Sequence, residues 1–383
     1  MKKTLLTAAI LAAAPLASQA VDFSYKGFGS LIGGMSTDQV DFQPNVKYGD
    51  GYYDQSFDIA PESRLALQLT AQFTDQVSVV GQVITRGAND WDIDLPWLYL
   101  NYQATDSVQI RAGRMKAPYY PYSDFQDVGY ALPWVSTPTN AYIVPADYIN
   151  GINVLTNFST GAIDHTVELY GSVMNDTTEF RSSTPDLEFN DSEIYGISLT
   201  STYDWLTTRM TYNEAKLDME SSALEGLQAG LAGVLGANSS MAIRTRLDGQ
   251  KASFIGLSAR GDFDKLFVIA EYNLLDWNTY ILPHQERAFI SAGYSVTEKF
   301  TPYLTLSKND DNDTSVTTTG GVIPGVDGAL LGLSKGSNAE GWALGARYDL
   351  MPDVALKAEY SSTNYDDLAN DENTFRVGVD FLF

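Results

Sequence analysis

The residues of this chain that could carry out chemistry are few, and they form no recognisable catalytic set. The 383 residues include two histidines, His165 and His284, and no cysteine. A serine hydrolase needs its nucleophile and its base within hydrogen-bonding reach, and neither histidine has a serine beside it in such a pattern. The lack of cysteine excludes thiol-ligated metal centres and disulfide bonds. The sequence therefore predicts no enzyme and no cofactor; a phospholipase or protease assembled across distant strands is the remaining catalytic alternative.

In several segments every second residue is apolar, and charged side chains recur at the positions between these apolar residues. We call the two sets of alternate positions the apolar and the polar parity. The basic side chains of the polar parity are Arg64, Arg86, Arg111, Arg209, Arg260, Arg347, Lys357 and Arg376. The acidic ones are Glu168, Glu271, Glu359 and Asp380. If this parity lines a water-filled passage, its basic excess predicts a weak preference for anions, because charges of one sign select the opposite ion. A simpler interpretation is that arginine occupies the wet face because it is costly in lipid.

The stretch between Lys116 and Ile149 is rich in aromatic residues and in proline. Its candidate functional residues are Tyr119, Tyr120, Tyr122, Asp124, Phe125, Asp127, Tyr130 and Trp134. Each proline fixes φ and cannot donate to a sheet, so we expect a stiff connection here and not a strand. Two roles stay open for the rings. They either pack against a wall and hold the connection in place, or form a surface along which sugar rings and apolar solutes slide.

The segments that must position these residues alternate between apolar and polar side chains, which is the period of a β-strand with two unlike faces. We expect about sixteen strands, near residues 23–35, 63–74, 77–87, 95–104, 107–115, 150–158, 163–173, 192–202, 206–214, 251–262, 266–275, 286–296, 299–308, 341–350, 354–362 and 374–383. Short links alternate with long acidic ones, as when periplasmic turns are short and outer loops are long. The pattern predicts an all-β fold, a transmembrane antiparallel β-barrel whose apolar face meets lipid and whose polar face lines the lumen.

Two of the long links hold recognisable motifs. Ser222 to Glu225 has the spacing of a capping box, and Gly236 is placed to end the segment, which predicts a helix over 222–236 without indicating its role. Asn309 to Asp313 has the composition of a calcium loop. It lacks the glycine at the sixth position and the glutamate at the twelfth, so no metal site is predicted there.

The first twenty residues have the features of a secretory signal. Lys2 and Lys3 precede the apolar run from Leu5 to Ala14, and small residues stand before the expected cleavage after Ala20. The rest has no apolar run long enough for a membrane helix, and the net charge of −24 argues against binding nucleic acid. We therefore expect a signal peptide over residues 1–20 and one barrel domain over residues 21–383.

The end of the chain carries a family resemblance. Apolar residues stand at every second position, and the last residue is phenylalanine: Phe375, Val377, Val379, Phe381 and Phe383. This tail resembles the closing strand of Gram-negative outer-membrane proteins, in which the barrel-assembly machinery reads it. With the signal, the strand number and the alternating links, the whole mature chain is similar to the trimeric general porins. The resemblance implies a homotrimer in the bacterial outer membrane, contacts with lipid and lipopolysaccharide, and a third outer loop that folds inward and narrows the lumen.

A shorter segment carries a second resemblance. Gly113, Arg114, Lys116 and Pro118 match the Gly-[Arg/Lys]-x-Lys-x-Pro segment of the porin O/P-like superfamily of anion-associated porins. In that superfamily the segment ends the strand before the third outer loop. No lysine cluster follows it here, so phosphate selectivity is not carried over.

These observations favour a passive outer-membrane diffusion channel for small hydrophilic solutes and ions. Two alternatives stay open, namely a substrate-specific channel for sugars or organic anions and a non-conducting adhesin or structural barrel. A TonB-dependent transporter is not expected, because the first strand follows the signal directly and leaves no room for a plug domain.

Overall fold

The computed structural model describes residues 21–37, 53–138, 141–142, 144, 148–178, 187–220, 222–236, 249–277, 284–312, 338–366 and 371–383. The strands are β1 (Asp22–Ser36), β2 (Arg64–Gln72), β3 (Val77–Arg86), β4 (Ile93–Thr105), β5 (Val108–Lys116), β6 (Tyr148–Thr160), β7 (Ile163–Thr178), β8 (Leu187–Tyr203), β9 (Leu206–Leu217), β10 (Met219–Glu220), β11 (Gln250–Phe263), β12 (Leu266–Asp276), β13 (His284–Tyr294), β14 (Phe300–Asn312), β15 (Ala339–Met351), β16 (Val354–Tyr365) and β17 (Glu372–Leu382). The helices are the 3-10 turns η2 (Gly87–Asn89), η3 (Ser123–Phe125) and η4 (Gly129–Ala131) and the α-helix α2 (Ser222–Leu235).

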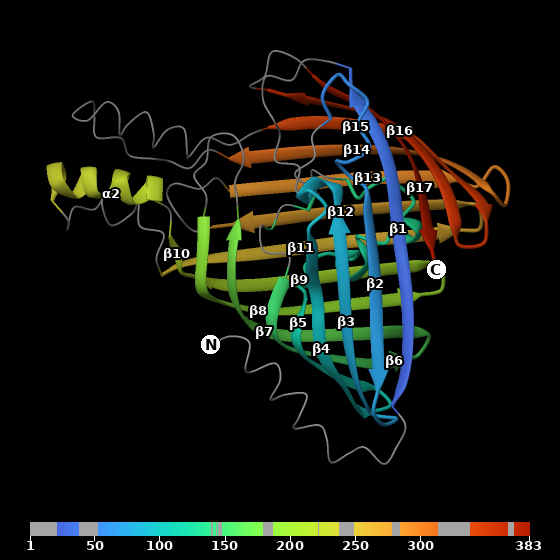
Figure 1. The fold of residues 1–383 in the computed structure, drawn as a ribbon, viewed down its shortest axis with the longest axis horizontal. Helices are drawn as coiled ribbons and strands as arrows, with labels where there is room; N and C mark the ends of the chain where they lie inside the picture. Colours follow the sequence, from blue (N-terminus) through green and yellow to red (C-terminus); the bar gives the residue numbers. More distant parts are fainter. Residues whose placement is uncertain are drawn as a thin grey trace.

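Sixteen long strands form one closed wall. Each strand pairs antiparallel with the next, β9 pairs with β11, and the ring closes where β1 pairs with β17 (Figure 1). At the closure, Phe28 stands opposite Leu382 and Ser36 opposite Thr374. The expected fold, a closed antiparallel barrel of about sixteen strands, is confirmed.

The two faces of the wall differ as a membrane barrel requires. The apolar parity is exposed on the outside, for example at Leu65, Leu67 and Leu69 of β2 and at Leu304 and Leu306 of β14. The polar parity is mostly buried inside the ring. In a water-soluble sheet the apolar face would be the covered one, so this inverted arrangement is the one that suits lipid outside and water inside.

All the tight turns lie at one end of the barrel. They join β2 to β3, β4 to β5, β6 to β7, β8 to β9, β11 to β12, β13 to β14 and β15 to β16. Asp204, Asp264 and Asp353 take the left-handed conformation in three of them, with φ of 46°, 53° and 64°, which aspartate tolerates better than most residues. We call this the short-turn end.

The hairpin of β7 and β8 is longer than the sequence pattern predicts. Pairing continues from Met174 to Thr178 and from Leu187 to Ser192, and the short strand β10 adds to β8 there. Backbone pairing can continue beyond the apolar band that meets lipid. There the side chains need not alternate between apolar and polar, so the sequence does not indicate a strand. These segments were therefore expected to be loops.

The helix expected in a long link is confirmed. It is α2, which ends directly before Gly236, a residue with φ of 87° that suits a helix C-terminus. In Figure 1 it projects from the barrel at the end opposite the short turns. Among the described residues, no helix is long and apolar enough to cross a membrane.

The described part of the connection between β5 and β6, residues 117–138, 141–142 and 144, lies inside the barrel, and we call it the inner loop. Its described part contacts Phe254 of β11, Ser291 of β13, Lys357 of β16 and Arg376 of β17. These strands stand on different sides of the ring, so only a segment within the ring can contact all of them. The inward-folded third loop is confirmed, and its packing against the wall makes the larger of the two buried apolar clusters among the described residues.

Candidate channel lumen

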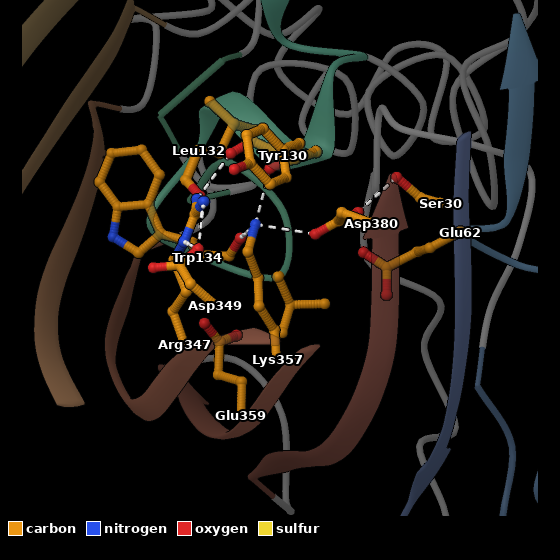
Figure 2. Close-up of polar contacts among 12 residues, drawn as sticks. Ser30, Glu62, Tyr130, Leu132, Trp134, Arg347, Asp349, Lys357, Glu359 and Asp380 are labelled. Atoms are coloured by element: carbon orange, nitrogen blue, oxygen red, sulfur yellow. Dashed lines mark hydrogen bonds and ion pairs between the residues drawn. The ribbon is translucent and has the colours of Figure 1, made fainter. Parts of the chain in front are cut away.

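The inner loop is attached to the wall by a buried lysine. Lys357 Nζ donates to the backbone oxygens of Gly129 at 2.6 Å and Trp134 at 2.7 Å, and it lies 2.9 Å from Asp380 Oδ2 (Figure 2). Asp380 also accepts a hydrogen bond from Ser30 Oγ at 2.5 Å. A Cβ on Gly129 would fall on the Asp380 carboxylate. Glycine is therefore what allows the loop backbone to approach the wall this closely.

Three arginines bind further backbone oxygens of the inner loop. Arg347 Nη1 donates to Tyr130 O at 2.6 Å and to Leu132 O at 3.0 Å (Figure 2). Arg209 Nη2 donates to Pro118 O at 2.8 Å, and Arg64 Nε donates to Asp127 O at 2.7 Å. A loop inside a tube lacks neighbouring strands for its carbonyl groups. The wall cations supply the donors that those buried groups require.

Arg376 connects the loop, the first outer connection and the wall. Its Nη1 donates to Ser136 Oγ at 2.9 Å and to Glu62 Oε1 at 3.0 Å, and its Nη2 bonds Glu359. Tyr303 donates to Glu359 Oε2 at 2.7 Å. Two acids thus share one arginine, and all three charged groups are largely shielded from water.

Asp127 is an anchor of the inner loop rather than an open lumen acid. Its Oδ2 lies 3.0 Å from Arg86 Nη2 and 3.3 Å from Lys116 Nζ. Burial opposes ionisation of this carboxyl, but Arg86, Lys116 and Arg64 outweigh it and hold its pKa well below the ordinary value. The side chain therefore stays charged at neutral pH.

Most of the predicted aromatic residues of the loop pack against the wall. Tyr119 and Tyr120 contact Phe254, with ring centroids 5.7 Å and 5.3 Å away. Trp134 stacks edge-on with Phe289 and Tyr122, and its Nε1 donates to Ser291 Oγ at 2.8 Å. Burial raises the pKa of Tyr122 to about 12, and the charge of Glu271 adds to this. These four loop rings are buried, which supports the packing role among the two left open.

The predicted lumen acids Glu168 and Glu271 are buried where the inner loop packs against the wall. Glu168 accepts from Asn153 Nδ2 at 2.6 Å and lies 3.4 Å from Arg209. Glu271 accepts from the Tyr142 hydroxyl at 3.1 Å. Both carboxylates are buried. Glu168 joins strands of the wall, and Glu271 joins the wall to Tyr142 of the loop, instead of facing open water.

Four Arg–Asp pairs remain partly open to solvent. In one, Arg86 lies 3.8 Å from Asp94 near the start of β4. Arg111 lies 3.5 Å from Asp124 of the loop. The other two pairs are formed within a strand, two residues apart. Arg260 binds Asp262 through two hydrogen bonds of 2.8 Å and 2.9 Å, and Arg347 binds Asp349 at 2.8 Å. The loop residues Phe125 and Tyr130 also keep exposed area.

The structure places all twelve residues predicted for the lumen on the inner face, in contact with the loop or with one another. It differs from the expectation in their surroundings. Seven of the eight cations lie within ion-pair distance of an acid in the described part of the chain. The acids that sequence reasoning missed include Glu62, Asp262 and Asp349. The last two stand two residues after an arginine on the same strand, a spacing that could have identified them.

The histidines form no catalytic set in the described residues. His165 Nδ1 lies 2.9 Å from Ser201 Oγ, a cross-strand pair that the sequence did not reveal, and its ring stacks on Phe158. No carboxylate lies within ion-pair distance of His165 in the described part of the chain. His284 has two, Asp276 at 4.0 Å and Glu286 at 3.6 Å, but no serine hydroxyl bonds it among the described residues. Asp311 of the acidic run belongs to β14 and binds Arg287. The described residues contain no cluster of three or more metal-ligating side chains.

Four residues of the expected assembly signal lie on β17, next to the closure, and Phe383 follows the end of this strand. Phe375, Val377 and Val379 stand opposite Met35, Gly33 and Leu31 of β1, and Phe381 stands opposite Gly29. A Cβ on Gly29 would fall 2.5 Å from the Phe381 ring, and one on Gly27 would overlap the Phe383 ring. The terminal rings therefore lie over glycines of the first strand.

No family model and no curated protein matches the sequence. The fold matches solved outer-membrane proteins. The anion-selective porin from Comamonas acidovorans is 12% identical with a TM-score of 0.59, over 95% of this chain and 100% of that one. The outer membrane channel DcaP of Acinetobacter baumannii is 12% identical with a TM-score of 0.59, over 96% and 99%. Outer-membrane expressed OmpT of Vibrio cholerae is 10% identical with a TM-score of 0.58, over 96% and 99%. At such identities the likeness shows the fold alone, a closed barrel of the kind found in outer-membrane porins and channels.

Proposed function

We propose that the protein is a passive outer-membrane channel through which small hydrophilic solutes and ions diffuse. The observation that carries this proposal is the presence of solvent-exposed charges inside a closed barrel. Asp124 and Asp262 point into the ring, and about half of each side chain is exposed. Water therefore reaches the lumen beside the inner loop. The apolar outer face supports a position in a membrane.

The attachment of the inner loop supports a passive channel. Cations of β2, β9, β15 and β16 bind its backbone oxygens, so the loop is held at many points around the ring. A constriction fixed in this way acts as a filter of constant width. It needs no cofactor and no energy source, and the proposal includes no enzyme activity.

The biological setting belongs to the same proposal. Residues 1–20 lie outside the described residues, and we take them as a cleaved signal that directs export. The tail from Phe375 to Phe383 would be read by the barrel-assembly machinery. The resemblance to general porins supports a homotrimer surrounded by lipid and lipopolysaccharide in the bacterial outer membrane.

Two finer expectations have less support from the contacts. A sugar-specific aromatic surface would need several exposed rings, and four of the six predicted ones, Tyr119, Tyr120, Tyr122 and Trp134, are buried. An anion preference from the basic wall would need unpaired cations, and seven of the eight predicted ones have acidic partners. We therefore favour general diffusion over substrate-specific transport.

Conductance in planar lipid bilayers tests the proposal. The purified mature protein, refolded in detergent, should insert and give stepwise currents that rise linearly with voltage. Liposomes that contain it should swell in neutral sugars at rates that fall smoothly with sugar size. Folded protein that gives no current would contradict the proposal and favour a structural barrel or adhesin. Currents blocked by micromolar amounts of one sugar or organic anion would indicate a substrate-specific channel.

A further inference from the structure

The ion pairs inside the barrel fall into two sets that differ in the exposure of the acid. In the first set the acids are Asp127, Glu168, Asp380, Glu62 and Glu359, whose side chains are at most 8% exposed. These pairs hold the inner loop to the wall. In the second set, Asp124, Asp262 and Asp349 are 48%, 53% and 35% exposed. Asp94 is a further exposed acid, at 39%, and lies 3.8 Å from Arg86, which it shares with the buried Asp127. Of the acids in these ion pairs, only those of the second set and Asp94 can interact strongly with an ion in the lumen, because burial and pairing neutralise the first set.

Within the second set, each carboxylate is more exposed than the arginine it binds. The partners Arg111, Arg260 and Arg347 are 21%, 40% and 17% exposed. Each guanidinium also lies over an aromatic ring, at 5.7 Å from Tyr99, 5.9 Å from Phe267 and 4.8 Å from Tyr130. The rings cover one face of each cation. All three pairs therefore turn their negative ends to the water of the lumen.

We propose that Asp124, Asp262 and Asp349 set the ion preference of the lumen, and that this preference is weakly for cations. The inference rests on the proposed function, since it needs a conducting lumen. It runs against the weak anion preference expected from the number of wall cations. Charges that are buried and paired contribute little to the electric field in the water. The few exposed carboxylates therefore decide which sign of ion the lumen prefers.

The three acids act at two places along the passage. Asp124 belongs to the inner loop, where the lumen is narrowed. Asp262 stands one residue before the end of β11 and Asp349 two residues before the end of β15, both at the short-turn end. An ion therefore meets carboxylates at the constriction and again at this mouth. The effect should be largest for Asp124, because a narrow passage brings the ion closest to the charge.

Reversal potentials in a salt gradient test the inference. Under a tenfold potassium chloride gradient, the wild-type channel should show a small potential with the sign of potassium preference. The triple variant Asp124→Asn, Asp262→Asn, Asp349→Asn leaves three partly exposed arginines without acidic partners. Its ratio of chloride to potassium permeability should rise by roughly threefold or more, the effect of uncompensated charge several ångströms from an ion in water.

The short turns provide a matched control. Asp204→Asn, Asp264→Asn, Asp353→Asn removes the same three charges from exposed turn positions outside the lumen. Asparagine tolerates the left-handed backbone as well as aspartate does. This variant should keep the wild-type reversal potential. A triple lumen variant that behaves like the turn variant, or a wild-type channel that prefers chloride, would overturn the inference.

A second variant covers the case in which the triple lumen variant does not fold. Arg260→Gln removes one partly exposed cation and leaves Asp262 unpaired, so potassium preference should increase. An unchanged or reversed potential in this variant would also contradict the inference. A wild-type barrel without any current would instead reject the proposed function, so the two failures are distinguishable.

Discussion

At the scale of single residues, the lumen is organised by charge pairing, and Lys357 is the sharpest case. It has one acidic partner, Asp380, and two loop carbonyl partners, and its side chain is 1% exposed. Lys357→Met keeps the volume of the side chain and removes its positive charge. The buried Asp380 carboxylate then keeps only the hydrogen bond from Ser30. We expect a loss of about 3–5 kcal/mol in the free energy of unfolding, as for other broken buried pairs. Urea unfolding of the refolded barrel, followed by tryptophan fluorescence, measures it.

An exposed pair on the outer surface is the control for that variant. Lys251 lies 3.1 Å from Glu214, and both side chains are largely in solvent. Lys251→Met should cost less than about 1 kcal/mol, because solvent screens such pairs. Equal losses for the two variants would mean that the buried contacts of Lys357 do not hold the loop.

The sequence predicts that these residues face inward, but it does not predict which groups they bind. Strand alternation places Arg347 and Lys357 inside. It cannot indicate that their acceptors are the carbonyls of Tyr130, Leu132, Gly129 and Trp134, more than two hundred residues earlier in the chain. Long-range pairing depends on how the loop folds in three dimensions. This is why a basic wall was expected where the structure has pairs.

At the scale of elements, the inner loop depends on the charge of Asp127. Its pKa lies below the ordinary value of 3.8, because Arg86 and Lys116 outweigh the effect of burial. A group with a lowered folded pKa stabilises the fold fully above its unfolded pKa, and this contribution is lost as pH falls below it. We therefore expect a constant difference in stability between wild type and Asp127→Asn from pH 7 to about 5. The difference should shrink below pH 3.8, as measured by urea unfolding at several pH values.

Asp124→Asn is the matched variant on the same loop, because Asp124 is half exposed. It should change stability by less than about 1 kcal/mol, since exposed pairs contribute little. A difference between wild type and Asp127→Asn that already disappears between pH 7 and 5 would show that Asp127 is not held as an anion by its neighbours.

The strands themselves were largely predictable, for a physical reason. A membrane barrel imposes a period of two on every segment that crosses lipid, so all sixteen long strands were located within a few residues. The pattern fails where lipid ends, as in the extensions of β7 and β8 and in β10. The α2 helix was predictable because a capping box and a terminal glycine are local signals.

At the scale of the whole molecule, the barrel exists only if its first and last strands meet. The register of β1 with β17 brings together residues that are about 350 positions apart in the chain. No local pattern predicts this register. Glycines make a close approach possible there. A Cβ on Gly378 would lie 3.1 Å from the backbone oxygen of Leu31, and one on Gly34 would lie 2.8 Å from that of Phe375.

The closure can be tested with Gly34→Ala. Its Cβ would also lie 2.9 Å from the Tyr53 ring, and neither the ring nor the backbone oxygen of Phe375 can move without shifting β17 or the first outer connection. We expect a loss of about 1–3 kcal/mol in stability, as for other overpacked sites, and a lower yield of folded barrel in detergent.

Gly81→Ala in β3 is the control, since its Cβ would be 3.8 Å from Leu98, an ordinary contact. Alanine is otherwise favoured over glycine in a strand by about 0.5–1 kcal/mol, so the control should be neutral or stabilising. If both variants fold equally well, the glycines of the closure are not what permits β1 and β17 to pair. The barrel would then tolerate a wider spacing between these two strands.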